Sequence, residues 1–490
     1  MGENWQDEYY IWDCAAGTGN LLAGLTNKYN IWASTLDQAD VNVMQERIEH
    51  GANLLENHVF QFDFLNDDFT KLPQGLQDIV NDEEKRKKLV IYINPPYAEA
   101  ANKSTVSKTG TNKTDVAVTT KVYDKYKNKI GIGGRELFVQ FLTRIYAELP
   151  NIVLAQFSTL KILQAPNFSD FREFFQAKLE KIFLVQADSF DNVKGKFPIG
   201  FFVWNIDKKE KFENIQSDIY DIKGDFIGNK NLYDSSTLKS INDWLITSRN
   251  RHNEKNIGFL SAKGNDFQNV NFIFIINEKN QLPHPRGTWI TDKNLKEVSI
   301  YLTVRHIIPP TWLNDRDQFI YPNEDWVTDF EFQYDCLAFV LFDNSNNIQS
   351  KFGTNHWIPY TEQEVNAKDK FASNFMTDFI KGKLKPESTA NLFENETVSN
   401  TPFEFSEEAR AVFDSGRELW KYYHSQNDIN VNASFYDIRE HFQGRNDKGR
   451  MNPRSNDEKY TALVGALRIK LQELADKITP KIYEYEFLKA

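Results

Sequence analysis

The feature that most constrains the fold is the alternation of short apolar stretches with amphipathic stretches in residues 1–207. Seven stretches have the composition of buried strands: residues 9–12, 31–36, 59–62, 89–93, 152–157, 181–187 and 200–206. Amphipathic segments such as residues 136–149 and 168–179 lie between several of them. This order predicts a doubly wound, mostly parallel sheet of seven strands. Only residues 188–199, with Gly195 and Pro198, separate the last two strands, so we expect an antiparallel hairpin there.

The length predicts more than one domain. The chain has 490 residues, whereas a single hydrophobic core usually stops growing at about 250–300 residues. The alternation ends near residue 208, and strand-like and loop-like pieces rich in Asn, Asp and aromatic residues follow. We therefore divide the chain into four parts: residues 1–207, 208–385, 386–402 and 403–490. The third is polar and predicts a linker, and the fourth has helical periodicity over residues 404–425 and 456–487.

Composition excludes several classes of protein. The longest apolar runs are too short to span a bilayer, and the acidic N-terminus lacks the order of a signal peptide. Cys14 and Cys336 match no metal spacing, and the histidines form no zinc motif. We expect a cytoplasmic protein that needs no metal and no membrane. The net charge of −11 argues weakly against nucleic acid, but such binding depends on local basic patches.

The first motif is the stretch IWDCAAGTGNLL at residues 11–22. A strand ends at Asp13, a turn containing Gly17 and Gly19 follows, and a helix is expected from Asn20. Glycines let the backbone approach a ligand closely, as in dinucleotide-binding folds. The candidate ligand-binding residues of this turn are Asp13, Ala15, Gly17, Thr18 and Gly19. A plain strand-to-helix turn is the alternative.

Two further carboxylates stand where a nucleoside needs them. Asp37 ends the second strand, close to the offset of about 20 residues at which an acid meets ribose hydroxyls. Asp63 ends the third strand, where it could accept a hydrogen bond from an adenine amine while Phe64 packs on the ring. Either aspartate could instead be a helix N-cap. Their joint position favours the nucleoside site.

The most informative motif is Asn94-Pro95-Pro96-Tyr97, directly after the strand LVIYI. An adenine N6 is a poor nucleophile because its lone pair is delocalised into the ring. The Asn94 side-chain oxygen and the Pro95 carbonyl can each accept one N6 hydrogen and direct the nitrogen lone pair at an electrophile. Pro96 stiffens the turn, and Tyr97 offers a face for a base taken out of the helix. The alternative is a simple Pro-Pro turn.

These motifs carry a resemblance to a known family. DCAAGTGNLL resembles the cofactor motif of the amino-methyltransferases, and NPPY resembles their catalytic motif. In order and spacing the chain is similar to the gamma class of DNA adenine-N6 methyltransferases of restriction–modification systems. The likeness continues through residues 134–149, 152–160 and 189–204, and therefore covers residues 9–206. It implies a Rossmann-like class I methyltransferase fold followed by a mixed α+β recognition region with a helical C-terminus.

The resemblance also implies roles for individual residues. The turn from Asp13 to Gly19 and Asp37 would bind S-adenosylmethionine, and Asp63 would bind its adenine. Asn94, Pro95, Pro96 and Tyr97 would hold and polarise the target adenine of double-stranded DNA. An aromatic residue on the far side of the flipped base maps to Phe190 or Phe197, and we favour Phe190.

The chain departs from the family in one respect. The family has a further cofactor-contacting segment upstream of the first motif, yet only ten residues precede the motif here. Either the sequence is truncated, or a specificity or N-terminal partner subunit, or the C-terminal helices, supply that segment. A non-catalytic or partner-dependent DNA-binding subunit is therefore the main alternative function. A protein glutamine methyltransferase, which also uses NPPY, and an RNA adenine methyltransferase are further alternatives.

Two basic stretches are candidate DNA contacts. Seven lysines and three acidic residues lie between Tyr97 and Arg135: Lys103, Lys108, Lys113, Lys121, Lys125, Lys127, Lys129, Glu99, Asp115 and Asp124. The second stretch is a predicted loop at residues 439–454 with Arg439, His441, Arg445, Lys448, Arg450 and Arg454. Arginine suits both phosphate binding and readout of base edges. We select Lys121, Arg445 and Arg450 as substrate-binding candidates, with solvated basic loops as the alternative.

Overall fold

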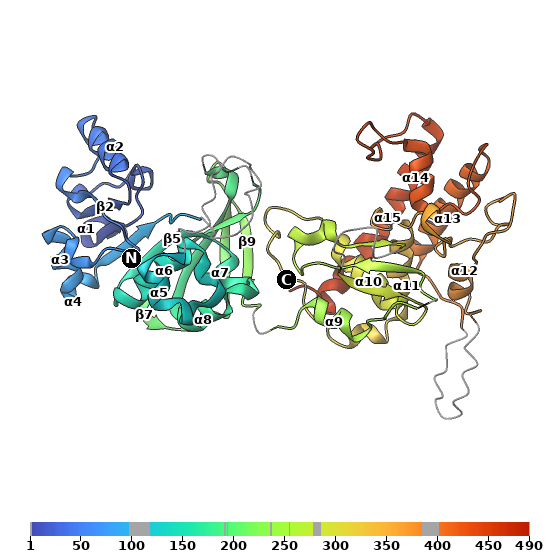
Figure 1. Ribbon diagram of the computed structural model, residues 1–490, viewed down its shortest axis with the longest axis horizontal. Coiled ribbons are helices and arrows are strands. Elements are labelled where there is room, and N and C mark those ends of the chain that lie inside the picture. The colour runs from blue at the N-terminus through green and yellow to red at the C-terminus, as the bar shows by residue number, and fades with distance from the viewer. Residues whose placement is uncertain are drawn as a thin grey trace, which may run out of the picture. The chain divides into compact units, whose positions relative to one another are not determined.

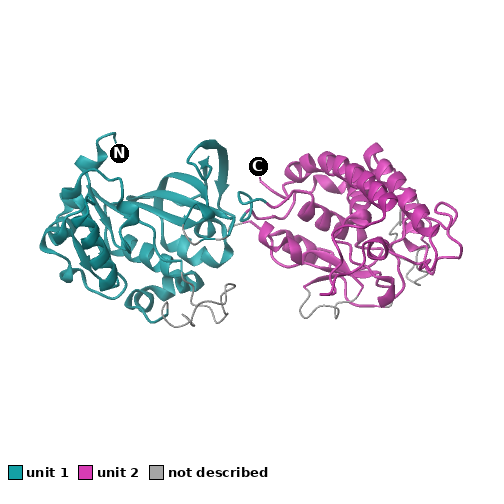
Figure 2. Cartoon of the chain, turned by 90° about the horizontal axis from the view of Figure 1, so that it is seen from above, with its two compact units in different colours: residues 1–237, 311–316 teal, residues 238–310, 317–490 magenta. Residues whose placement is uncertain are grey.

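A computed structural model describes most of the chain. The described residues are 2–97, 118–190, 193, 195–235, 238–253, 255–277, 286–384 and 401–489. The chain forms two compact units, coloured teal and magenta in Figure 2. Unit 1 consists of residues Met1–Thr237 and Thr311–Arg316, and unit 2 consists of Leu238–Pro310 and Asp317–Ala490. Unit 1 thus extends past the predicted domain limit at residue 207, and all but residues 401–402 of the predicted linker lie outside the described residues.

Unit 1 is a mixed α/β fold built on a large sheet (Figure 1). Its strands are β1 Tyr10–Asp13, β2 Ile31–Thr35, β3 Val59–Gln61, β4 Leu89–Ile93, β5 Val153–Thr159, β6 Ala177–Gln186, β7 Pro198–Lys209, β8 Asn214–Tyr220 and β9 Phe226–Tyr233. Their spatial order is β3-β2-β1-β4-β5-β7-β6-β8-β9. The seven predicted strands are present, but the sheet has nine. β8 and β9 escaped prediction because polar side chains such as Asn214, Gln216 and Asp218 interrupt them and lie exposed at the edge of the sheet.

The strand directions place the ends of two strands side by side. β1 pairs in parallel with both β2 and β4, and β4 pairs in parallel with β5. From β1 the chain proceeds outward to β2 and β3, whereas β4 leads to β5 on the other side. Open α/β sheets bind ligands at such a reversal, beyond the carboxyl ends of the strands. β7 is antiparallel to β5 and to β6, which confirms the predicted hairpin.

Helices cover both faces of this sheet (Figure 1). They are α1 Trp5–Glu8, α2 Gln38–Glu49, α3 Gln74–Asn81, α4 Glu83–Arg86, α5 Lys121–Ile130, α6 Leu137–Glu148, α7 Lys161–Gln164 and α8 Ser169–Phe174. On one face Val41 and Met44 of α2 pack against the strand residues Ile11 and Ile31. On the other face α5 to α8 bury a larger core, and each fully buried large apolar side chain contributes about 1.5–3 kcal/mol. The segment predicted as a helix at residues 168–179 ends earlier because β6 begins at Ala177.

Unit 2 combines a small antiparallel sheet with helices. The strands are β10 Gly258–Ser261, β11 Phe274–Ile276 and β12 Gly287–Ile290, in the order β11-β10-β12. The helices are α9 Ile241–Thr247, α10 Leu295–His306, α11 Phe330–Phe342, α12 Phe375–Ile380, α13 Glu407–His424, α14 Phe435–Gln443 and α15 Glu458–Glu484. α13 and α15 confirm the two helices predicted from periodicity. The predicted basic loop at residues 439–454 is partly helical, since Arg439 and His441 belong to α14.

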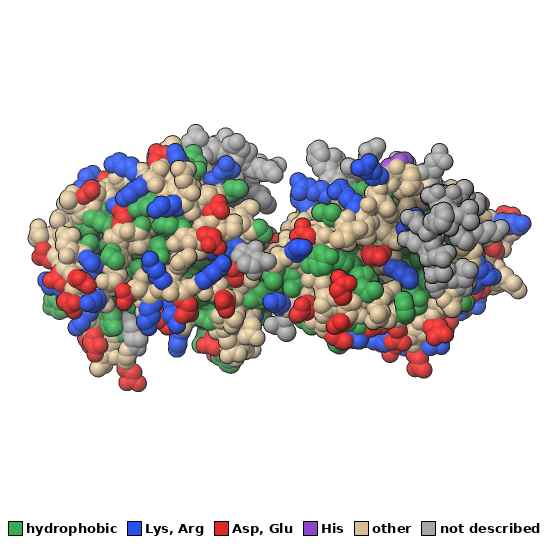
Figure 3. Space-filling view, turned by 90° about the horizontal axis from the view of Figure 1, so that it is seen from below, with side chains coloured by type: hydrophobic (Ala, Val, Ile, Leu, Met, Phe, Trp, Pro, Cys, Tyr) green, Lys and Arg blue, Asp and Glu red, His purple; other side chains and the backbone are tan. Residues whose placement is uncertain are grey.

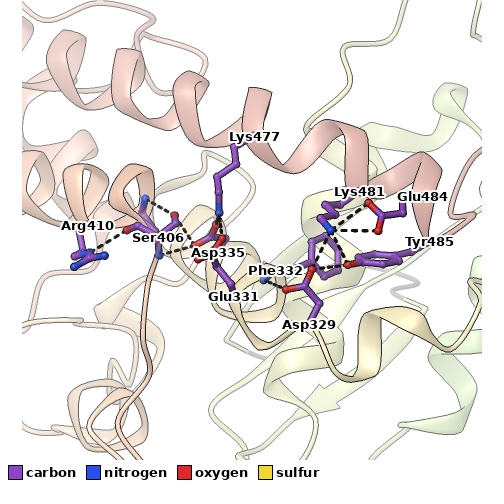
Figure 4. A network of polar contacts seen from close by, with 11 residues as sticks. Asp329, Glu331, Phe332, Asp335, Ser406, Arg410, Lys477, Lys481, Glu484 and Tyr485 are labelled. Carbon is purple, nitrogen blue, oxygen red and sulfur yellow. Dashed lines mark hydrogen bonds and ion pairs between the residues drawn. The ribbon is translucent and has the colours of Figure 1, made fainter.

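A buried polar network joins three helices of unit 2 (Figure 4). The carboxylate of Asp335 in α11 is 1% exposed and accepts a hydrogen bond from the Ser406 hydroxyl at 2.8 Å. Lys477 of α15 forms an ion pair with the same carboxylate at 2.6 Å. Ser406 in turn caps the N-terminus of α13. The charge of Asp335 is thus paired with Lys477 of α15, and its carboxylate also accepts a hydrogen bond from the N-cap of α13.

The surface carries both signs of charge. On the face drawn in Figure 3, Lys and Arg side chains are interspersed with Asp and Glu on both units. Within the described part of the chain, no helix has the length and apolar character needed to cross a membrane.

Candidate active site

The turn after β1 is a tight backbone cradle. The Asp13 carboxylate is 1% exposed and accepts a hydrogen bond from the Ala15 N–H at 3.0 Å. Gly17 and Gly19 have φ of 52° and 82°, a left-handed conformation that favours glycine. A short 3-10 turn, Asn20–Leu22, follows in place of the longer helix expected there.

Two backbone N–H groups of this turn, those of Gly17 and Thr18, have no hydrogen-bond partner among the described residues. A Cβ on Gly17 would meet no atom within 4 Å. Arg47 of α2 stabilises the turn. Its Nη1 donates to the Thr18 carbonyl at 2.7 Å and to Asn20 Oδ1 at 2.6 Å. Sequence reasoning missed Arg47, because one arginine in the last turn of a helix carries no specific signal.

Burial makes the Asp13 carboxyl group of this turn harder to ionise. Burial raises the pKa of Asp13 from 3.8 to about 7, because the ionised carboxylate is deprived of water. Burial and the nearby charge of Asp13 also raise the pKa of Tyr92. A positive group bound beside Asp13 would stabilise its ionised form.

Asp37 stands at the end of the neighbouring strand. It lies two residues beyond the end of β2 and directly before α2, yet its side chain makes no capping hydrogen bond, and the residue is exposed. Asp37 therefore occupies the N-cap position of α2, but its side chain does not cap the helix. The carboxylate remains available to accept hydrogen bonds from a ligand.

Asp63 and Phe64 differ from expectation in part. Asp63 accepts hydrogen bonds from the Leu65 N–H, from the Asn66 N–H and from Asn66 Nδ2, at 3.0, 3.1 and 2.8 Å. Since a carboxylate has about four acceptor positions, one remains for an amine. The Phe64 ring is 2% exposed and stacks on Phe141 at 5.1 Å, so it belongs to the core and does not offer a face to adenine.

Arg144 of α6 holds this loop in place. Its guanidinium donates to the carbonyl oxygens of Phe64 and Asp67 and forms an ion pair with Glu148 at 2.8 Å. It also lies 4.3 Å from the centre of the Phe69 ring. Arg144 was not selected from the sequence, although a lone arginine among the apolar residues of α6 is a usable signal.

The Asn94-Pro95-Pro96-Tyr97 segment follows β4, the neighbour of β1 in the sheet. Asn94 is half-buried, Pro95 is buried and Pro96 is exposed. The Tyr97 hydroxyl donates to Asn94 Oδ1 at 2.8 Å, and its ring, 40% exposed, lies 6.1 Å from that of Phe138. No described residue donates to the Pro95 carbonyl. Two amide-type oxygens are thus presented beside a partly exposed aromatic ring.

The two aromatic candidates lie at the same edge of the sheet. Phe190 follows the short turn after β6, and its ring meets that of Phe157, near the carboxyl end of β5, at 5.2 Å. Phe157 contacts Phe201 at 4.8 Å, and Phe201 contacts Tyr92 of β4 at 5.9 Å. This row of rings connects Phe190 to the strand that carries Asn94.

The backbone of Phe197 is fixed by a hydrogen bond. Its carbonyl accepts a hydrogen bond from the Ala187 N–H at 2.9 Å, and its side chain is partly buried. Among the described residues it has no ring contact to β5 like that of Phe190, and the choice between the two stays a prediction.

Three of the lysines after Tyr97 have polar partners within unit 1. Lys121 begins α5, and its Nζ donates to the Asn66 carbonyl at 2.8 Å, which ties the helix to the Asp63 loop. Lys125 pairs with Glu148 and Lys127 pairs with Asp124. Lys103, Lys108 and Lys113 lie outside the described residues. The stretch predicted as a long loop therefore includes a helix.

The arginines of the second basic stretch differ from one another. Arg445 donates to Glu440 at 2.5 Å, to the Gly449 carbonyl at 2.6 Å and to the Tyr436 hydroxyl at 2.9 Å. Its guanidinium therefore stabilises its own loop, which does not favour the expected role in DNA binding. Arg450 is exposed, and only its backbone contacts Asn446.

No group of three or more His, Cys, Asp or Glu side chains that could hold a metal ion occurs among the residues that the structure describes.

Comparisons with known proteins give structural likenesses alone. No family model matches the sequence, and no curated protein matches it. The chain is similar to a DrdV–DNA complex, at 15% identity over 45% of this chain and 25% of that chain, with a TM-score of 0.31. It is similar to the type IIG restriction endonuclease BpuSI, at 20% identity over 44% and 24% of the two chains, with a TM-score of 0.30.

A third similar structure is the methyltransferase subunit of a type I restriction–modification system from Streptococcus thermophilus. It shares 17% identity over 46% of this chain and 44% of that chain, with a TM-score of 0.28. The chain thus spans between 24% and 44% of the length of these three structures. With TM-scores of 0.28 to 0.31, these structures assign no role to individual residues of this chain.

Proposed function

We propose that this chain is the catalytic part of an S-adenosylmethionine-dependent DNA methyltransferase that methylates N6 of a flipped adenine in a restriction–modification or related defence system. One observation carries the proposal. The glycine turn with Asp13 and the Asn94-Pro95-Pro96-Tyr97 segment follow two strands that are neighbours at the reversal point of the sheet. A site that holds a methyl donor must lie beside the site that holds the acceptor, and the neighbouring positions of these two segments support the proposal.

The residues present fit S-adenosylmethionine. The free N–H groups of Gly17 and Thr18 suit its carboxylate, and the buried Asp13 carboxylate suits its positive charge. Asp37 has an uncommitted carboxylate for the ribose hydroxyls, and Asp63 retains one acceptor position for the adenine amine. When bound, the cofactor would supply a methyl group already activated by a sulfonium, so the chemistry requires no metal.

The acceptor side is built by Asn94 and Pro95. Asn94 Oδ1 and the Pro95 carbonyl would each accept one hydrogen of the adenine amine and so localise the nitrogen lone pair. The Tyr97 hydroxyl already donates to Asn94 Oδ1, but an amide oxygen has two lone pairs and can accept from both groups. The Tyr97 ring would stack on one face of the base, and Phe190 is our candidate for the other. The proton lost after transfer would leave to water.

The remaining assignments follow from this function. Double-stranded DNA is the proposed partner, and unit 2 is the proposed target-recognition region, with Arg450 as a candidate contact. A partner subunit that contributes sequence specificity is also proposed.

The test is methyl transfer to DNA. The chain is incubated with labelled S-adenosylmethionine and mixed-sequence duplex DNA, and the digested nucleosides are separated. We expect label in N6-methyladenine. Asn94→Ala removes one of the two acceptors and should abolish transfer while cofactor binding persists. Asn42→Ala, at an asparagine on the surface helix α2, is the matched control and should retain full activity.

Other outcomes distinguish the alternatives. Label in RNA adenine or in a protein glutamine would identify a different acceptor. Cofactor binding without transfer would indicate a partner-dependent subunit. Failure to bind the cofactor would contradict the proposal for the isolated chain.

A further inference from the structure

Unit 2 contains a basic hollow. Its residues come from positions 249–289 of the sequence and do not include the Arg445 loop. The segment Arg-Asn-Arg-His at residues 249–252 follows α9 and lies against β12. The hollow has a volume of about 460 Å³ and is lined by Arg249, Asn250, Arg251, His252, Phe259, Gly287 and Trp289. None of these lining residues is acidic, although the whole chain carries a net charge of −11. The hollow is therefore locally positive in an acidic protein.

The two arginine charges of the hollow are available. Arg249 and Arg251 are exposed, and neither guanidinium forms an ion pair or a hydrogen bond with a residue that the structure describes. Arg445, in contrast, uses its donors on Glu440, Gly449 and Tyr436. An unpaired guanidinium can bind an anion without first breaking an internal contact.

The backbone beneath these arginines is held firmly. The Asn250 N–H donates to Thr288 Oγ1, and Asn250 Nδ2 donates to Thr291 Oγ1, both at 2.9 Å. The buried Asn294 side chain donates to the Ser248 carbonyl at 3.0 Å and to the Trp289 carbonyl at 2.9 Å. The segment is thereby fixed to β12, so less conformational freedom is lost when a ligand binds.

An aromatic ring completes the hollow. Trp289 is partly exposed, and the rings of His252 and Phe259 meet it edge to face at 4.4 and 5.0 Å. These contacts fix the orientation of the indole. Cationic side chains beside an aromatic ring are the combination with which proteins bind the backbone and bases of nucleic acids.

We infer that this hollow binds the sugar–phosphate backbone of DNA, with Arg249 and Arg251 on phosphate oxygens and Trp289 against the adjoining sugar or base. The inference rests on the proposed function, which makes DNA the partner. A guanidinium can donate two parallel hydrogen bonds to one phosphate, and such contacts position a protein on DNA whatever the sequence. The hollow is thus a positioning contact of unit 2.

The test compares two charge-matched variants of the full chain. Arg249→Gln with Arg251→Gln removes the two charges of the hollow, and Lys370→Gln with Lys383→Gln removes two charges from exposed positions elsewhere in unit 2. Affinity for a labelled mixed-sequence duplex is measured by fluorescence anisotropy between about 50 and 200 mM salt. The hollow variant should bind roughly tenfold to a hundredfold more weakly, with a salt slope reduced by about one to two. The control should stay close to the unmodified chain.

Two further measurements keep the result interpretable. Arg251→Lys keeps the charge but loses the planar fork, so it should bind DNA more weakly than the unmodified chain and more tightly than the double variant. Binding of S-adenosylmethionine should be unchanged in all variants, which shows that unit 1 remains folded.

The outcomes separate this inference from the proposed function. Equal loss of affinity in the hollow variant and its control would overturn the inference even if the chain methylates DNA. A chain that transfers methyl groups to another acceptor and does not bind DNA would overturn both. Selective loss in the hollow variant supports the inference, whether or not the isolated chain shows transfer.

Discussion

At the scale of single residues, the Asp13 carboxyl group links the stability of unit 1 to pH. Its pKa is raised by burial from 3.8 to about 7, so the folded protein keeps this proton at a pH where the unfolded chain has lost it. The free energy of unfolding should therefore fall as pH rises from about 4 to 7 and remain constant above that range. The effect has an upper limit of about 4 kcal/mol, from 1.36 kcal/mol per pKa unit.

Asp13→Asn isolates this contribution. The amide oxygen can still accept from the Ala15 N–H but does not titrate, so the variant should be more stable than the unmodified chain above pH 7 and similar to it near pH 4. Urea unfolding of both proteins across this range, followed by tryptophan fluorescence, measures the difference. A difference that does not change with pH would show that Asp13 ionises normally in the folded state.

The residues of the site show how far the sequence could predict it. Asp13 ends a strand, Asp37 and Asn94 follow strands, and a strand end is readable from a short apolar run. The direction in which a ring points depends on tertiary packing. The expected stacking of Phe64 on an adenine ring could not be checked from the sequence, because Phe141 and Arg144, which pack on Phe64, lie far along the chain. Arg47 supports the site through the Thr18 carbonyl, and such a contact leaves no mark in the residue type, whereas Arg144 stands out as a charge among the apolar residues of α6.

At the scale of elements, the Asp335–Lys477 pair should be essential for the packing of α11 against α15 (Figure 4). Lys477→Met leaves the Asp335 charge buried with only Ser406 as a partner, and we expect a loss of about 3 kcal/mol in the free energy of unfolding of unit 2. Asp335→Asn in the same chain removes the unpaired charge while keeping the Ser406 contact. The double variant should therefore be more stable than Lys477→Met alone.

A second lysine of α15 provides the control. Lys481 lies one turn later and pairs with Asp329, which also accepts from the Tyr485 hydroxyl and the Phe332 N–H. Because Asp329 keeps these partners and is more exposed than Asp335, Lys481→Met should cost only about 1 kcal/mol or less. Urea denaturation of the four proteins completes the comparison. A double variant no more stable than Lys477→Met alone would show that the unpaired Asp335 charge is not the cause of the loss.

The elements that were predicted correctly are those whose burial produces an apolar run or an amphipathic periodicity in the sequence. β4 lies where its apolar run predicted it, and α13 and α15 have amphipathic periodicity that is independent of their surroundings. The edge strands β8 and β9 gain their stability from backbone pairing with the sheet, which a polar sequence does not reveal. α10 and, beyond its first turn, α11 have no exposed face, so they lack the polar stripe that marks a surface helix.

At the scale of the whole molecule, the chain passes between its two units more than once. Residues Thr311–Arg316 belong to unit 1 although unit 2 surrounds them in the sequence. Leu313 packs against the main core of unit 1, and its carbonyl accepts a hydrogen bond from Lys230 of β9 at 2.9 Å. The predicted linear division of the chain could not anticipate such a return, because a sequence boundary carries no information on segments that come back.

The proposed cofactor site lies entirely within unit 1, and this gives the last prediction. A ligand that binds only the folded form stabilises it by about 2.7 kcal/mol at a free concentration of 100 times its Kd. S-adenosylmethionine should therefore slow amide hydrogen exchange in the peptides that contain Asp13, Asp37 and Asn94. Exchange in α13 and α15 should not change, because each unit has its own core. Asn94→Ala should keep this protection because Asn94 is assigned to the base, whereas protection that spreads equally over both units would place the cofactor elsewhere.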